Sequence, residues 1–172
     1  MEGGRACIVF PHAPWDTSGC DVLIVADSGV SWADIRGSPD LIVVVTDGDG
    51  GIGGRLGLAE YSMFLAHQHG DNPWLPMLWE VTRPAGRGAL ILTGQVEVPK
   101  GLAVLSPFGF TDGDRSILLA ASLGASVIEF SMADVIHHKG APEIKTRKLE
   151  LYLNIAREIM DVFGYECGEV RT

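Results

Sequence analysis

Short apolar runs, each followed by glycine or acidic residues, recur along the chain. They are rich in Val, Ile and Leu, most are too short for helices, and they lack strict apolar–polar alternation. This pattern is typical of strands that are buried on both faces of a parallel sheet. The runs predicted as strands are Cys7–Phe10, Val22–Ala26, Leu41–Thr46, Tyr61–Ala66, Ala89–Thr93, Leu102–Leu105 and Ser126–Phe130.

Three helices are predicted from apolar periodicity and end signals. Asn72-Pro73 opens the first, with Asn as N-cap and Pro at the first helical position. Asp114 is expected to cap a second helix over Arg115–Leu123. The third spans Ile144–Phe163, where an apolar stripe recurs at helical spacing until Gly164 ends it.

Strands alternating with helices predict an α/β fold, a three-layer Rossmann-like sheet with helices on both faces. The sheet is expected to be mostly parallel. The connection Gly94–Gly101 is too short for a helix, so a hairpin-like link with Gln95–Val98 as an extended arm would make the sheet mixed. A length of 172 residues, without linker or repeat, predicts a single domain over residues 1–172.

Composition narrows the function classes. The formal net charge of −9 argues against nonspecific binding to nucleic acid or anionic membrane. No apolar run approaches the ~20 residues of a membrane span, and the N-terminus does not resemble a signal peptide. We therefore expect a cytoplasmic protein. The many small residues and a mean hydropathy of +0.21 weakly favour a homo-oligomer.

The three cysteines, Cys7, Cys20 and Cys167, are scattered and form no C-x-x-C pair. Neither a zinc site nor a disulfide framework is indicated. The expectation is three small buried hydrophobic residues in a reducing cytoplasm.

Acidic and polar side chains follow four of the predicted strands. An aspartate at such a position is usually a turn former or a helix cap, but here the pattern recurs four times. The carboxyl ends of parallel strands meet at one edge, where α/β sheets bind ligands. Because Asp repels phosphate unless a cation lies between them, the clusters predict a divalent metal that carries a phosphorylated ligand. The clusters are Asp27; Asp47 and Asp49; His67, His69, Asp71 and Asn72; and Asp112 and Asp114.

Arg115, Lys145 and Lys148 are candidate phosphate clamps. Arg115 stands at a predicted helix start beside the acidic residues. Lys145 and Lys148 share a helix face, which is equally consistent with a solvated surface.

Two alternative interpretations use the same residues. Gly48–Gly53 matches the G-x-G-x-x-G dinucleotide pattern, but it follows the third strand instead of the first, and Asp47 and Asp49 would face the pyrophosphate. His67 and His69 could ligate zinc together with an aspartate, donate hydrogen bonds to a phosphate or substrate, or be structural.

Four blocks of the chain resemble the archaeal 6-hydroxymethyl-7,8-dihydropterin pyrophosphokinases, the MptE-like family, which is related in fold to the catalytic domain of thiamine pyrophosphokinases. The resemblance covers roughly residues 20–160. Gly48 departs from it, because the family usually carries a larger apolar residue there. The blocks are Val45-Thr46-Asp47-Gly48-Asp49-Gly50, His67-Gln68-His69-Gly70-Asp71-Asn72, Thr93-Gly94-Gln95 and Gly109-Phe110-Thr111-Asp112-Gly113-Asp114-Arg115.

The resemblance implies transfer of diphosphate from ATP to the hydroxymethyl group of a reduced pterin, with release of AMP and a requirement for Mg²⁺, for folate- or methanopterin-type cofactors. It places the metal on Asp47, Asp49, Asp71 and Asp112. A thiamine pyrophosphokinase and a non-catalytic nucleotide- or dinucleotide-binding module are the alternatives. The resemblance assigns the nucleotide or pterin pocket to Asp27, Asn72, Gln95, Thr111 and Asp114. The capacity to bind phosphate or substrate adds five more candidate binding residues: His67, His69, Arg115, Lys145 and Lys148.

Overall fold

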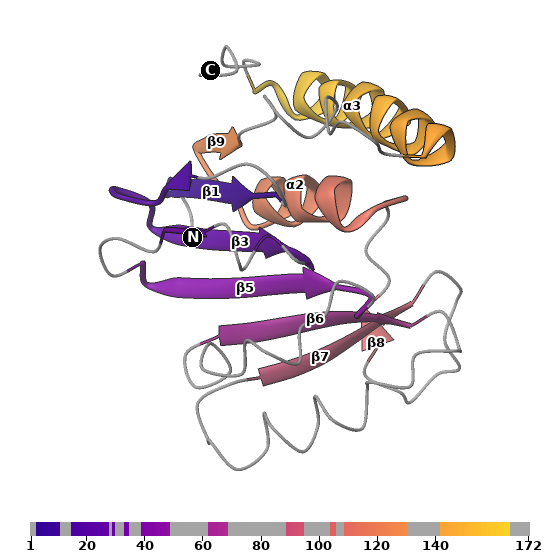
Figure 1. Ribbon diagram of the computed structural model, residues 1–172. Coiled ribbons are helices and arrows are strands. Elements are labelled where there is room, and N and C mark those ends of the chain that lie inside the picture. Colours follow the sequence, from indigo (N-terminus) through magenta and orange to yellow (C-terminus); the bar gives the residue numbers. More distant parts are fainter. Residues whose placement is uncertain are drawn as a thin grey trace.

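The computed structural model describes residues 3–10, 15–27, 29, 33–34, 39–48, 62–68, 89–94, 104–105, 109–130 and 142–165. Seven strands in these ranges form one sheet in the order β8-β7-β6-β5-β3-β1-β9, shown in Figure 1. The strands are β1 (Arg5–Val9), β3 (Val22–Ala26), β5 (Leu41–Thr46), β6 (Ser62–Gln68), β7 (Ala89–Gly94), β8 (Val104–Leu105) and β9 (Val127–Phe130).

Every described strand pair runs parallel, including the separate two-stranded sheet of β2 (Trp15–Asp16) and β4 (Ala33–Asp34). The α/β class is thus confirmed, while the suggestion of a mixed sheet is wrong for the described ladders. The segment 95–98, expected as an extended arm, lies outside the described residues, as does the helix predicted from Asn72.

The central strands are buried on both faces, which explains their continuous apolar runs. In the parallel register, Ile24 lies beside Ile8 and Val43, and all three belong to the core on one face. Leu23 and Val25 alternate to the other face, in a second core cluster that also contains both Cys7 and Cys20. Alternate residues of a strand point to opposite faces of the sheet, and here both faces are covered. No position along β3 is therefore polar, and the sequence shows no apolar–polar alternation.

Two helices, α2 (Asp112–Ser122) and α3 (Glu143–Phe163), contribute to the first of these cores, and α3 packs on the outer side of α2 (Figure 1). Both described helices contribute to this one core, so the expectation of helices on both faces of the sheet stays a prediction for the other face. Gly164 ends α3 in the left-handed conformation (φ 74°), as the sequence predicts. The start of α2 differs from the prediction, because Thr111 and not Asp114 is the N-cap. Neither helix is both long and apolar enough to cross a membrane.

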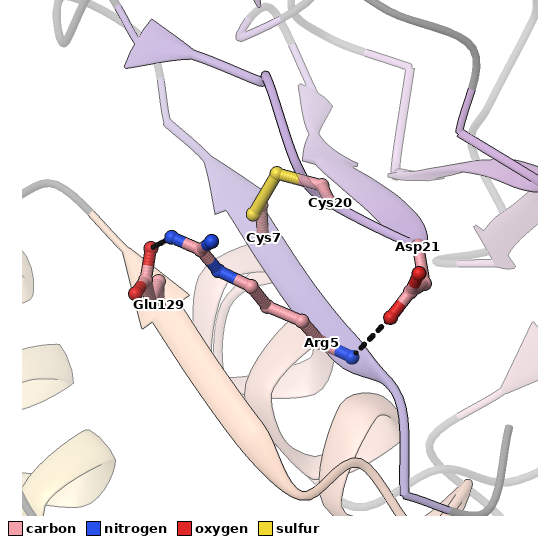
Figure 2. Close-up of a disulfide and its surroundings, with 5 residues drawn as sticks. All are labelled: Arg5, Cys7, Cys20, Asp21 and Glu129. Atoms are coloured by element: carbon pink, nitrogen blue, oxygen red, sulfur yellow. Dashed lines mark hydrogen bonds and ion pairs between the residues drawn. A yellow bond between two sulfur atoms is a disulfide. The ribbon is translucent and has the colours of Figure 1, made fainter.

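A disulfide joins Cys7 in β1 to Cys20, just ahead of β3, with the Cα atoms 5.8 Å apart (Figure 2). The expectation of reduced cysteines is therefore wrong for this pair. The sequence shows only two cysteines 13 residues apart. Their proximity arises because β1 and β3 are neighbours with Ala6 opposite Val22, so that the chain between them returns to the same end of the sheet. Cys167 lies outside the described residues.

Polar contacts tie β1 to both its neighbours close to this disulfide. The backbone N–H of Arg5 donates to Asp21 Oδ2 at 2.8 Å, and the Arg5 guanidinium forms an ion pair of 2.5 Å with Glu129 in β9 (Figure 2). The disulfide and these contacts lie toward the amino end of β3, while Asp27 follows its carboxyl end. The length of β3 therefore separates the disulfide from Asp27.

Tyr152 of α3 is fully buried, and its hydroxyl finds no hydrogen-bond partner among the described residues. Burial, followed by the charge of Asp114, raises the pKa of Tyr152 well above its usual value of about 10. The folded protein therefore keeps the phenol neutral at a pH where the unfolded chain loses the proton. This contribution to stability is present below about pH 10 and is lost as the pH rises through the folded pKa.

We expect Tyr152→Phe to leave the free energy of unfolding at pH 7 unchanged or to raise it by up to about 2 kcal/mol, because an unpaired buried hydroxyl is costly. Above pH 10 the variant should lose less stability than the wild type. Tyr165→Phe is the matched control: its hydroxyl donates to the Ala125 carbonyl at 2.5 Å, so its loss should cost about 1 kcal/mol. Urea unfolding at pH 7 and above pH 10 measures the free energies of unfolding of both variants. Destabilisation by Tyr152→Phe at pH 7 would contradict the prediction.

Candidate metal centre

Three aspartates from distant parts of the chain converge at the carboxyl edge of the sheet. Asp27 follows β3, Asp47 follows β5, and Asp112 is the first residue of α2. One carboxylate oxygen from each lies within 4.8 Å of the others, and all three residues are half-buried. Because β3 and β5 are parallel neighbours, their ends lie side by side, and α2 starts where they end. Three such oxygens form a donor set that suits a hard divalent cation.

Thr46, the last residue of β5, connects two members of this cluster. Its buried hydroxyl donates to Asp27 Oδ1 at 2.7 Å and accepts from the backbone N–H of Gly48 at 2.8 Å. The same side chain therefore orients the Asp27 carboxylate and shapes the turn that carries Asp47. Thr46 was not among the site residues predicted from the sequence, although it is the one polar residue at the end of the apolar run Leu41–Thr46.

The backbone around the cluster departs from ordinary conformations at two residues. Gly48 has φ 89°, a region that side chains rarely enter, so the turn after Asp47 requires glycine. The positive φ explains why position 48 of this chain is glycine, where the resembled family usually carries a larger apolar residue. Asp27 itself has φ 44°, which is uncommon for a non-glycine residue and is a form of strain that concentrates at functional sites.

Arg115 supports Asp112 from within α2. Its guanidinium is almost fully buried, and Nη1 lies 3.1 Å from Asp112 Oδ1 while Nη2 donates to the Gly109 carbonyl at 3.4 Å. A Cβ on Gly109 would collide with the Arg115 side chain, and its φ of 142° also favours glycine. Three carboxylates and one guanidinium give the cluster a formal charge of −2, which a divalent cation neutralises.

Asp114 and Thr111 hold the start of α2. Asp114 is fully buried and accepts hydrogen bonds from the backbone N–H groups of Phe110 (2.6 Å) and Thr111 (2.5 Å), while the Thr111 hydroxyl accepts from the Asp114 N–H at 3.3 Å. This reciprocal capping box fixes the first turn and therefore the position of Asp112. The expected pocket residues Asp114 and Thr111 thus have a structural task in the described contacts.

His67 lies near the carboxyl end of β6, the strand beside β5. It is fully buried, and its Nδ1 lies 3.1 Å from the Thr93 hydroxyl of β7, its register partner. Which atom donates depends on the histidine tautomer. The contact joins two buried side chains on neighbouring strands and favours the structural interpretation of this histidine.

The remaining candidates divide into two groups. Lys145 and Lys148 are exposed on α3, and no contact within the described ranges joins them to the three carboxylates. The second group lies outside the described residues, so their assignments remain predictions: Asp49, His69, Asp71, Asn72 and Gln95.

The chain is similar to the 6-hydroxymethyl-7,8-dihydropterin pyrophosphokinase of Pyrococcus furiosus, with 33% identity over 138 residues. The match covers 72% of this chain and 53% of the relative, so the chain spans about half the length of that protein. No family model matches the chain, and no solved structure matches it significantly. The similarity is consistent with the resemblance found in the four sequence blocks.

Proposed function

We propose that this chain transfers diphosphate from ATP to the hydroxymethyl group of 6-hydroxymethyl-7,8-dihydropterin in a magnesium-dependent reaction that releases AMP. The observation that carries the proposal is the convergence of Asp27, Asp47 and Asp112 at the edge where α/β sheets bind ligands. The similarity to a pterin pyrophosphokinase supports the choice of reaction. The cytoplasm is the proposed compartment, because the reaction consumes ATP.

The residues at this edge suit Mg²⁺. Asp27, Asp47 and Asp112 would hold the ion through carboxylate oxygens, the ligands that Mg²⁺ prefers, and Asp49 and Asp71 are proposed as further ligands. When bound, Mg²⁺ neutralises phosphate charge and so stabilises the charge that develops in phosphoryl transfer. Arg115 keeps the Asp112 carboxylate in place, and Thr46 does the same for Asp27.

In the proposed reaction, the pterin alcohol oxygen bonds to the β-phosphorus of ATP while the bond from that phosphorus to the α–β bridging oxygen breaks. AMP leaves with the bridging oxygen, and the alcohol proton is transferred to a base. A carboxylate of the cluster is better placed for this proton than His67, because His67 is buried against Thr93. The protein mainly positions the groups, since phosphoryl transfer needs little covalent assistance.

The proposal is tested by incubating the purified chain with ATP, Mg²⁺ and the reduced pterin and measuring AMP and pterin diphosphate by chromatography. We expect both products in equal amounts, and neither when the metal is chelated. Turnover with thiamine in place of the pterin would identify the alternative kinase. Tight nucleotide binding without AMP release would instead support a non-catalytic binding module.

Thr46 provides a test of how the cluster is supported. We expect Thr46→Val to weaken Mg²⁺ binding by about 10- to 100-fold, because Asp27 loses the hydroxyl that orients it. Thr46→Ser keeps the hydroxyl and should bind as the wild type does. Isothermal titration calorimetry measures the Mg²⁺ affinity of both variants. If Thr46→Val binds Mg²⁺ as tightly as the wild type, Thr46 does not orient Asp27 for metal binding.

A further inference from the structure

Helix α3 carries a second apolar stripe besides the one that packs on the core. Ile144 and Val162 are 80% and 81% exposed, and Leu151 is 46% exposed. With the half-buried Ile155, these residues follow one another at intervals of 7, 4 and 7 along the helix. At 100° per residue, all four lie within about 20° of one line that runs for roughly 27 Å. No described residue covers the exposed ends of this stripe.

The core-facing residues of α3 occupy a different side of the helix. Tyr152, Ala156 and Met160 are buried in the core shared with α2 and the sheet. They lie roughly a quarter to a half turn around the helix from the exposed stripe. Ile155 also packs against this core, so the stripe borders the core at its middle, whereas Ile144 and Val162 at its two ends remain largely exposed. These ends make the stripe long for an unpartnered apolar surface.

The four residues of this stripe are spaced symmetrically about Leu153. Ile144 and Val162 are each nine residues from Leu153, and Leu151 and Ile155 are each two residues from it. If two copies of α3 pack antiparallel about a two-fold axis at this level, Ile144 of one meets Val162 of the other, and Leu151 meets Ile155. Such a self-complementary surface is what an isologous dimer requires.

Charge complements the same arrangement. Arg147 and Glu158 lie on the same side of the stripe, since 11 residues bring a helix back to within about 20°. They stand six and five residues from Leu153, so Arg147 of one copy would approach the partner's Glu158. The helix as a whole carries four basic and four acidic residues, although the chain has a net charge of −9. A balanced helix suits a second copy better than an anionic lipid surface or nucleic acid.

We propose that the exposed stripe of α3 (Ile144, Leu151, Ile155 and Val162) forms a two-fold homodimer interface between antiparallel α3 helices. The proposal is independent of the reaction proposed above. Apolar contacts at the four levels would supply the affinity, and the Arg147–Glu158 pairs would fix the antiparallel direction.

Sedimentation velocity over a range of protein concentrations tests the interface. We expect the wild type to reach twice the monomer mass of 18.4 kDa, and Ile144→Glu and Val162→Glu each to weaken dimerisation at least tenfold. Both side chains are largely exposed, so these variants should keep the thermal unfolding midpoint of the monomer. Leu123→Glu, at another exposed apolar residue, is the matched control and should leave the dimer intact.

The charged pair gives a second, independent readout. Arg147→Glu and Glu158→Arg should each weaken the dimer by about two- to fivefold, and the double variant should restore it. Arg147→Glu also removes the exposed Arg147–Glu143 pair within the helix, but that loss is small and the second substitution would not restore it. A chain that stays monomeric at all concentrations overturns the proposal. So does a dimer that resists Ile144→Glu but dissociates with Val127→Lys, which would place the interface on the edge strand β9.

Discussion

Replacing Asp47 with Asn is expected to reduce AMP release by more than about 100-fold while leaving the fold intact. Loss of a residue that merely orients a metal ligand already costs about 10- to 100-fold, and Asp47 is proposed as a ligand itself. The substitution keeps the shape of the side chain but changes the formal charge of the cluster from −2 to −1. The turn after β5 should persist, because Thr46 and Gly48 hold it through their own hydrogen bond.

Stability without metal distinguishes this explanation from simple unfolding. Three carboxylates within 4.8 Å repel one another, so Asp47→Asn should leave the thermal midpoint of the metal-free protein unchanged or slightly higher. Added Mg²⁺ should raise the midpoint of the wild type, which binds it when folded, and should raise that of the variant far less. Differential scanning fluorimetry with and without Mg²⁺ measures both effects.

Asp40→Asn is the matched control, because Asp40 lies directly before the first residue of β5 and is exposed at the opposite end of the strand. Its activity and its response to Mg²⁺ should equal those of the wild type. Near-normal turnover in Asp47→Asn, or an unchanged metal response, would exclude the metal role of Asp47.

The sheet could be predicted from sequence to a large extent because its strands are buried on both faces. The run Leu41–Thr46 matches β5 and Val22–Ala26 matches β3, since an uninterrupted apolar run bounded by acidic residues admits few other structures. The parallel direction of β7 and β8 was less predictable. It depends on the connection between them, and a segment as short as residues 95–103 is compatible with several paths.

The candidate site was only partly predictable. Asp47 and Asp112 were expected as metal ligands, whereas Asp27 was expected in the nucleotide or pterin pocket. Its place in the cluster follows from β3 being the neighbour of β5, and local sequence does not encode strand order. Capping by Thr111 was missed for two reasons. Asp112 and Asp114 can cap a helix as well as Thr111 can, and the helix begins before the first residue of its apolar periodicity.

Removal of the Cys7–Cys20 disulfide is expected to lower the free energy of unfolding by about 3 kcal/mol, from the entropy of a closed loop of this length in the unfolded chain. That is a large share of the 5–15 kcal/mol typical of domains. For a chain of this size, the thermal midpoint should fall by roughly 10 °C. Activity at low temperature should not change, because the disulfide lies toward the amino end of β3 and the carboxylate cluster lies at the other end.

The measurement is urea unfolding of the wild type with and without a reductant, beside the Cys7→Ser/Cys20→Ser double variant. The wild type should lose stability on reduction, while the variant should start lower and not respond. Thiol titration of the unfolded, unreduced chain should find one reactive group among the three cysteines. Three reactive thiols, or equal stability of the oxidised and reduced protein, would contradict the prediction. Disulfides are uncommon in the cytoplasm of mesophiles but frequent in hyperthermophiles, so a positive result also bears on the temperature at which this chain works.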